Sequence, residues 1–206
     1  MVLILATRNP DKIEEIQQIF QDSEAPLLSL FDFPQIGPVE ETGKTLEENA
    51  VLKAKKVSRS IRKVALADDT GLEVEALQGR PGVHSARFAG PGASYEANRL
   101  KLLKSLQGVP EEKRGAVFRC IAALASPEGR FVTFEGVCRG RIGFEPKGEG
   151  GFGYDPLFIV EGIGKTFAEM TLEEKNQVSH RAKAMRKVME YLKKKEIGDP
   201  LLENRE

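Results

Sequence analysis

The chain has little of what several protein classes require: its 206 residues include no tryptophan, two cysteines and two histidines, and its net charge is zero. Because 31 basic residues balance 31 acidic ones, no overall field draws it to nucleic acid or to an anionic membrane, and neither partner is expected. Cys120 and Cys138 lack metal-ligand spacing and give no disulfide framework, so we predict buried thiols. With only His84 and His180 besides, the sequence does not favour a structural zinc site.

Long apolar runs are also missing. None approaches the roughly 20 residues that a membrane-spanning helix needs. The apolar start, 1–6, is too short for a signal peptide and lacks its basic flank. We therefore expect a cytoplasmic protein. A hydrophobic content of 40% suffices for one compact domain, or for two lobes that share a sheet.

Apolar periodicity predicts alternating strands and helices. The sequences Thr45-Leu-Glu-Glu48 and Thr171-Leu-Glu-Glu174 are typical of capping boxes at helix starts. Ser94 is expected to cap a helix whose buried face is Ala97, Leu100, Leu103 and Leu106. The predicted strands are 2–6, 27–30, 116–125, 131–137 and 157–160; the predicted helices are 11–20, 45–62, 94–106 and two successive segments from 171 and 179; a flexible tail is expected at 198–206.

Two adjacent carboxylates, Asp68 and Asp69, follow the apolar run 64–67. Alternation resumes at 72–76, so we predict two strands with the acids in a turn at the mouth of the first. Ligands bind beyond the carboxyl ends of strands in open α/β sheets. Adjacent carboxylates repel, and a divalent cation or a bound cationic group would relieve that repulsion. A solvated acidic turn remains the alternative.

The first polar turn contains Thr7, Asn9 and Lys12. Short polar side chains, a cation and the amides of a helix start indicate an anion site there. An ordinary N-cap with a surface lysine is the other interpretation. Further along, a carboxylate from Glu40 or Glu41 could meet one of the two aspartates around Mg²⁺, which binds a few carboxylates, waters and phosphate oxygens.

Two later segments are rich in recognition groups. Phe152 and Tyr154 flank a glycine and could form an aromatic wall beside the acceptor Asp155, although Phe152 could equally be core. Donors gather at Lys175, His180 and Arg181, although a solvated helix face often carries such charges.

Together these segments resemble the Ham1 or inosine triphosphate pyrophosphatase family, whose blocks occur in order over nearly the whole chain. The resemblance implies an α/β fold with a long mixed β-sheet flanked by helices, in which a single bilobal domain, 1–206, holds a nucleotide in a central cleft. It also implies hydrolysis of dITP, ITP and XTP to the monophosphate and pyrophosphate with Mg²⁺, by a homodimer. The blocks are Thr7-Arg8-Asn9-Pro10-Asp11-Lys12; Glu41-Thr42-Gly43 with Glu48-Asn49-Ala50 and Lys53-Ala54; Ala67-Asp68-Asp69-Thr70-Gly71-Leu72; Pro81-Gly82 with Ser85-Ala86-Arg87; Gly151-Phe152-Gly153-Tyr154-Asp155-Pro156; and Glu174-Lys175 with Ser179-His180-Arg181.

The resemblance also implies roles for individual residues. Asp69 would be a metal ligand and the base that deprotonates water, with Asp68 in support. Glu41 would be the second metal ligand, although Glu40 remains an alternative. His84 receives no role. Thr7, Asn9 and Lys12 would hold the phosphates, and Thr70 would contact the substrate. The nucleotide pocket would be formed by Phe152, Gly153, Tyr154, Asp155, Lys175, His180 and Arg181. Further substrate-binding residues would be Arg8, Pro10, Asp11, Asn49 and Lys53.

Two other functions stay open at this point. One is a Maf-like pyrophosphatase acting on other modified nucleotides. The other is a nucleotide-binding sensor without catalysis. The blocks around Phe152 and His180 argue against the first, and the retention of both acids with the phosphate turn argues against the second.

Overall fold

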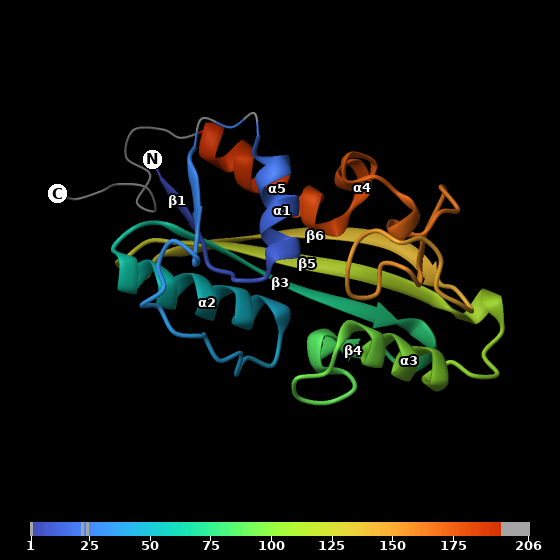
Figure 1. Cartoon of the computed structure of the whole chain (residues 1–206). Coiled ribbons are helices and arrows are strands. Elements are labelled where there is room, and N and C mark those ends of the chain that lie inside the picture. The colour runs from blue at the N-terminus through green and yellow to red at the C-terminus, as the bar shows by residue number, and fades with distance from the viewer. Residues whose placement is uncertain (1, 22, 24, 195–206) are drawn as a thin grey trace. The chain divides into compact units, whose positions relative to one another are not determined.

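The computed structural model describes residues 2–21, 23 and 25–194 of the chain, which form a mixed α/β structure (Figure 1). The tail predicted at 198–206 lies outside these residues. The strands are β1 (Leu3–Leu5), β2 (Leu27–Ser29), β3 (Ala65–Val74), β4 (Pro81–Gly82), β5 (Gly115–Ala125), β6 (Phe131–Ile142) and β7 (Phe158–Val160). The helices are α1 (Pro10–Ile19), α2 (Leu46–Ile61), α3 (Tyr95–Ser105), α4 (Leu172–Val178) and α5 (His180–Lys193), with short 3₁₀ turns at Glu75–Leu77, Ser85–Arg87, Glu111–Lys113 and Phe167–Glu169.

The strands join in the order β2-β1-β3-β5-β6-β7, and β4 pairs with β3. Strand β1 is parallel to β2 and β3, whereas the β3–β4 and β6–β7 pairs are antiparallel. The predicted α/β class with a mixed sheet is therefore confirmed. None of the helices in the described part of the chain is long and apolar enough to cross a membrane.

The chain divides into two compact units. The first contains the residues up to Asp69, Cys120–Gly136 and the chain from Arg181 onward; the second contains Thr70–Arg119 and Val137–His180. Since β3, β5 and β6 each contribute residues to both, the chain passes repeatedly from one unit to the other.

In the first unit, the two faces of the sheet bury separate cores. Leu3 and Leu5 pack with Ile16 of α1 and Met185 of α5. The helices α1 and α5 lie side by side (Figure 1). Ile4 points the other way and packs among alanines of α2. The alternation follows from the two-residue period of a strand. Full burial of each such side chain contributes about 1.5–3 kcal/mol, so both faces of β1 help to fix the helices that bear the site residues.

The second unit has one core, built on Leu72 and Val74 of β3 and on an aromatic group. Phe118 meets Phe158 edge to face, with ring centroids 4.7 Å apart. The Ser85 hydroxyl accepts a hydrogen bond of 2.8 Å from the amide of Leu72. This bond ties the 3₁₀ turn at Ser85–Arg87 to the strand that contains the two aspartates.

The predicted acidic turn is wrong. Asp68 and Asp69 lie inside β3, which continues without interruption to Val74, and Ala76 belongs to a 3₁₀ turn instead of a second strand. The turn prediction assumed that two carboxylates must reach water. Both are buried, and nearby cations replace the water.

Two finer predictions need correction. Leu100 of α3 is 60% exposed, while Leu102 is fully buried, because leucines on several sides of this helix left its inner face ambiguous. At α2, the Thr45 hydroxyl accepts from the Glu48 amide as predicted, but the Glu48 carboxylate accepts from the Lys44 amide. The capping box at Thr171 and the Ser94 cap are confirmed. Both cysteines are buried, as predicted.

Candidate functional site

Asp68 and Asp69 are neighbours on β3, so the strand's alternation sends their side chains to opposite faces of the sheet. Asp68 meets Lys12 of α1, and Asp69 meets Lys53 of α2. The two carboxylates therefore do not share one position, and each has its own cation. Two ion pairs, Asp68 with Lys12 and Asp69 with Lys53, thus lie where the first unit's part of β3 ends.

Asp68 is held from two helices. Lys12 Nζ donates to its Oδ2 at 2.8 Å, and Arg181 Nη2 donates to the same oxygen at 3.2 Å. The guanidinium also forms a short contact with Glu15 of α1. Burial acts to raise the pKa of Asp68, but the Lys12 ammonium and the Arg181 guanidinium hold it well below its usual range. The charged form of Asp68 is thus favoured, and its carboxylate holds the Lys12 ammonium in place.

Asp69 shares one ammonium with Glu41. Lys53 Nζ donates to Asp69 Oδ1 at 2.7 Å and to Glu41 Oε1 at 2.9 Å. Burial lowers the pKa of Lys53, but Asp69, Asp68 and Glu41 together raise it to about 12. For Asp69, burial and the Glu41 carboxylate raise the pKa against the opposing effect of Lys53 and Lys12. Asp69 is therefore easier to protonate than an ordinary aspartate.

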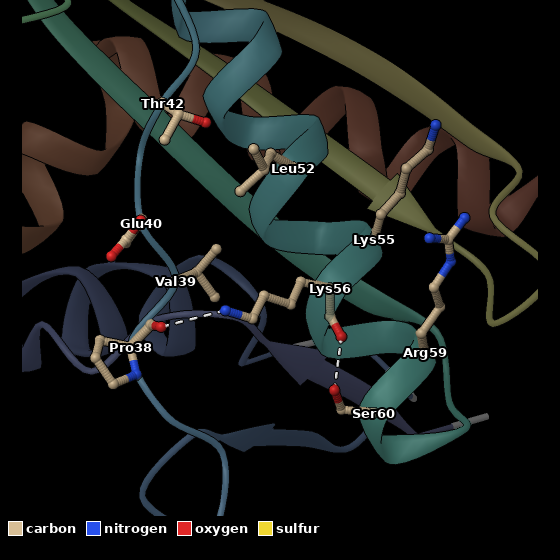
Figure 2. A pocket seen from close by; sticks show the side chains of 9 residues that line it. All are labelled: Pro38, Val39, Glu40, Thr42, Leu52, Lys55, Lys56, Arg59 and Ser60. Atoms are coloured by element: carbon tan, nitrogen blue, oxygen red, sulfur yellow. Dashed lines mark hydrogen bonds between the residues drawn. The ribbon is translucent and has the colours of Figure 1, made fainter.

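Glu40 has different surroundings from Glu41. It lines a surface hollow of about 670 Å³ together with residues of α2 that include Lys55, Lys56 and Arg59 (Figure 2). In that hollow, Lys56 Nζ donates to the carbonyl of Pro38 at 3.4 Å. The structure therefore brings Glu41, and not Glu40, to Lys53, the partner of Asp69.

The loop that bears Glu41 is anchored by Asn49, which is fully buried. Asn49 Oδ1 accepts from the Gly43 amide at 2.8 Å, while its Nδ2 lies 3.5 Å from Asp69 Oδ2. A Cβ on Gly43 would lie 2.6 Å from Asn49 Oδ1. Only glycine fits there without displacing the amide, so Gly43, Asn49 and Asp69 form a continuous support.

The polar turn before α1 is an N-cap. Asn9 Oδ1 accepts from the amides of Asp11 and Lys12, and Thr7 Oγ1 accepts from the Asn9 amide. Pro10 occupies the first helical position, where its missing amide costs nothing. The N-cap interpretation is thus confirmed for the side-chain oxygens of Thr7 and Asn9. Lys12, in contrast, pairs with Asp68 and is not a simple surface lysine. Arg8 lies in the same turn, and its Nη2 donates to the Phe33 carbonyl.

In the second unit, Asp155 organises the segment 152–155. Its Oδ2 accepts from the Phe152 amide at 2.8 Å and from Lys175 Nζ at 2.5 Å. The Lys175 ammonium also lies 4.9 Å from the Phe152 ring centroid, a cation–π contact. Phe152 is only partly buried, unlike Tyr154 and Asp155. The structure thus brings together the predicted acceptor, a donor and the aromatic ring.

Tyr154 and His180 are also buried in the second unit. The Tyr154 hydroxyl donates to the Ser85 carbonyl at 2.9 Å, and burial raises the pKa of its phenol well above the usual range. The His180 ring stacks on Phe118 at 4.6 Å with an interplanar angle of 10°. Arg181, the next residue in the chain, pairs with Asp68 and belongs to the first unit. Thr70 begins the second unit.

Sequence reasoning missed three residues of these networks. Glu15 is buried against Arg181, and its spacing from Lys12 on one face of α1 could have indicated this. Arg99 donates to the Gly153 carbonyl at 2.9 Å, and the Tyr95 ring lies 5.8 Å from Phe152. No sequence signal connects α3 to that loop, because the contacts span more than fifty residues.

Within the described residues, no three His, Cys, Asp or Glu side chains form a cluster that could hold a metal. Glu41 and Asp69 nevertheless converge on one cation, the Lys53 ammonium. Two carboxylates suit Mg²⁺, which takes the rest of its ligands from water and phosphate oxygens. The donor set therefore fits a magnesium ion bound together with a phosphorylated ligand.

Known proteins share this architecture. The chain is 52% identical over 197 residues to the dITP/XTP pyrophosphatase of Elusimicrobium minutum, a match that covers 94% of this chain and 100% of that one. It matches the solved HAM1 protein of Coxiella burnetii with a TM-score of 0.86 and 36% identity, over 95% of this chain and all of the other. The Staphylococcus aureus Ham1 protein gives 0.84 and 38%, with the same coverage. A model of the Ham1 family matches residues 3–191, and the chain belongs to that family.

Proposed function

We propose that this protein hydrolyses the purine nucleoside triphosphates dITP, ITP and XTP to monophosphate and pyrophosphate, and so removes them from the nucleotide pool. The observation that carries the proposal is the Lys53-centred cluster, in which Glu41 and Asp69 converge on one buried cation in a member of the Ham1 family. Its relatives named dITP/XTP pyrophosphatase match this chain over nearly its whole length. The reaction class is that of a nucleoside triphosphate pyrophosphatase.

The phosphate end of the substrate binds beside α1. The Lys12 ammonium has three N–H donors, and Asp68 accepts one of them. The other donors can point to phosphate oxygens. The Asn9 side-chain amide and the positive end of the α1 dipole add further positive potential. These groups offset the negative charge that grows on the pyrophosphate as its bond to the α-phosphorus breaks.

The metal in this proposal is Mg²⁺, held by Glu41 and Asp69. When bound, Mg²⁺ lowers the pKa of a coordinated water and offsets phosphate charge. Asp69 orients the attacking water and accepts its proton. Lys53 contacts the same two carboxylates, so its ammonium and the metal compete for their charge.

The base end is formed by the second unit. Inosine and xanthine have an acceptor oxygen at purine position 6, where adenine has an amino donor. Donors such as Lys175 or the amides of Gly153 and Tyr154 bind the oxygen and leave adenine's amino group unpaired. His180 lies on Phe118 in the same unit. The Arg181 guanidinium is engaged by Asp68 and Glu15. We therefore assign Arg181 to the support of Asp68 and not to base recognition.

A substrate panel tests the proposal. The purified protein is incubated with Mg²⁺ and dITP, XTP, the four common dNTPs or a modified pyrimidine triphosphate, and kcat/KM is measured for each. Preference for dITP and XTP supports the proposal. Preference for the modified pyrimidine would favour the Maf-like alternative, and tight dITP binding without turnover would favour a sensor.

The family resemblance also supports a homodimer and a cytoplasmic location, which we propose on that ground. Sedimentation at micromolar concentration gives the mass in solution. A monomer mass throughout would contradict the dimer.

A further inference from the structure

Two residues at the start of α3 reach the loop 152–155. Arg99 Nη1 donates to the Gly153 carbonyl at 2.9 Å. The Tyr95 ring lies 5.8 Å from that of Phe152, at an interplanar angle of 43°. The two residues are four positions apart, so they project from the same face of the helix. Neither belongs to the sequence blocks that identify the family.

The loop needs such an anchor at Gly153. Its ends are closed by the Asp155 amide, which donates to the Phe152 carbonyl at 3.1 Å, and by the Phe152 amide, which donates to Asp155 Oδ2. Gly153 lies between them at a φ of +60° and has no side chain to hold it. Because glycine explores more backbone conformations than other residues, the bond from Arg99 limits where the peptide after Gly153 can turn.

We propose that Arg99 is a positioning residue for purine recognition and that Tyr95 steadies the Phe152 ring on the same loop. The inference rests on the proposed function, because it assigns 152–155 to the base. A loop that must be ordered during binding costs free energy at that step. Loss of the Arg99 bond therefore weakens binding of the base and raises KM. The kcat stays unchanged, because the residues around Asp69 that carry out the hydrolysis are not affected.

Lys101 offers a matched control on the same helix. Its Nζ donates to the Phe88 carbonyl at 2.6 Å and lies 4.8 Å from the Phe88 ring centroid. Lys101→Met thus removes an equivalent tie from α3 to a different loop. Any general loosening of α3 affects both variants alike, whereas an effect on the base appears only with Arg99.

The experiment compares the wild type with Arg99→Met, Arg99→Lys, Tyr95→Ala and Lys101→Met. It measures kcat and KM for dITP, and calorimetric binding of inosine monophosphate and of base-free tripolyphosphate. For Arg99→Met, we expect KM and the monophosphate dissociation constant to rise about five- to tenfold, the net scale of one intramolecular hydrogen bond. The kcat and tripolyphosphate binding stay within about twofold of the wild type. Arg99→Lys recovers part of the loss, and Tyr95→Ala gives a smaller rise of the same kind.

Equal rises in KM for Arg99→Met and Lys101→Met would overturn the inference. Equal weakening of monophosphate and tripolyphosphate binding would do the same. A wild type that releases no pyrophosphate from dITP contradicts the proposed function separately. In that case the calorimetric comparison still decides the role of Arg99. If Arg99→Met does not fold, Arg99→Lys and Tyr95→Ala supply the test.

Discussion

Lys53 and Asp69 form a buried ion pair in which the lysine Nζ lies 2.7 Å from the carboxylate Oδ1. The same ammonium holds Glu41 at 2.9 Å. Before any metal binds, one side chain of α2 thus keeps two prospective ligands together. Such a cation prevents the mutual repulsion that two carboxylates would otherwise suffer, and it makes stability depend on Lys53.

Replacement of Lys53 by methionine should destabilise the protein by about 3 kcal/mol, because Asp69 would stay buried without its partner. Urea unfolding measures this loss. Mg²⁺ should raise the unfolding midpoint of this variant more than that of the wild type, since the ion no longer competes with an ammonium. An equal rise in both proteins would contradict the proposed competition.

Lys56→Met is the matched control for that variant. Lys56 lies on the same helix and is exposed, and its Nζ donates a long bond of 3.4 Å to the Pro38 carbonyl (Figure 2). Surface substitutions of this kind change stability by about 0.5 kcal/mol or less. A similar loss in both variants would mean that charge on α2 in general, and not the pair with Asp69, is responsible.

Gly43→Ala should lower kcat/KM by about tenfold, the scale expected when a supporting group of a metal ligand is displaced. The added Cβ would lie 2.6 Å from Asn49 Oδ1 and force the amide away from Asp69. Gly37→Ala is the control, because a Cβ there meets nothing within 4 Å. Steady-state kinetics with dITP compares the two. Wild-type activity in Gly43→Ala would remove Asn49 from its supporting role.

Tyr154 should ionise later than an ordinary tyrosine during an alkaline titration, because burial raises its pKa. The unfolded chain loses this proton near pH about 10. Stability from the neutral phenol is therefore fully present below that pH and declines as pH rises toward the folded-state pKa. Tyrosinate absorbance follows the titration. The late step should vanish in Tyr154→Phe, and a late step that persists there belongs to another tyrosine.

Glu15→Gln should lower stability by about 3 kcal/mol, because it removes one of the two carboxylates that balance buried Arg181. The ratio of kcat/KM for dITP to that for dATP should stay unchanged, since Arg181 supports Asp68 on our assignment. Chemical unfolding and kinetics give the two values. A collapse of the base preference in a folded Glu15→Gln protein would return Arg181 to base recognition.

Much of the fold follows from local rules. The strand and helix positions along α1, α2 and β5 were predictable because their apolar spacing matches one period clearly. Strand β3 was not, since local chemistry at Asp68 and Asp69 favours a turn. The deciding groups, Lys12, Lys53 and Arg181, come from distant helices. A single sequence offers no rule for such pairings.

The candidate site shows the same division. The motif blocks alone indicate Asp69 and one of the glutamates Glu40 and Glu41, because carboxylates with phosphate-binding groups imply a metal. The choice of Glu41 over Glu40 required the observed contact with Lys53. The hydrogen bond between Arg99 and Gly153 could not be predicted from the sequence. The packing of α3 against a loop that is distant in the chain produces no periodic pattern in either segment.

Phosphorus NMR of dITP incubated with the protein and Mg²⁺ tests the central claim most directly. The account predicts dIMP and pyrophosphate as the first products, loss of turnover with a chelator, and a rate at least about a hundredfold lower for Asp69→Asn. Orthophosphate with dIDP as the first products, or near wild-type turnover in Asp69→Asn, would contradict it.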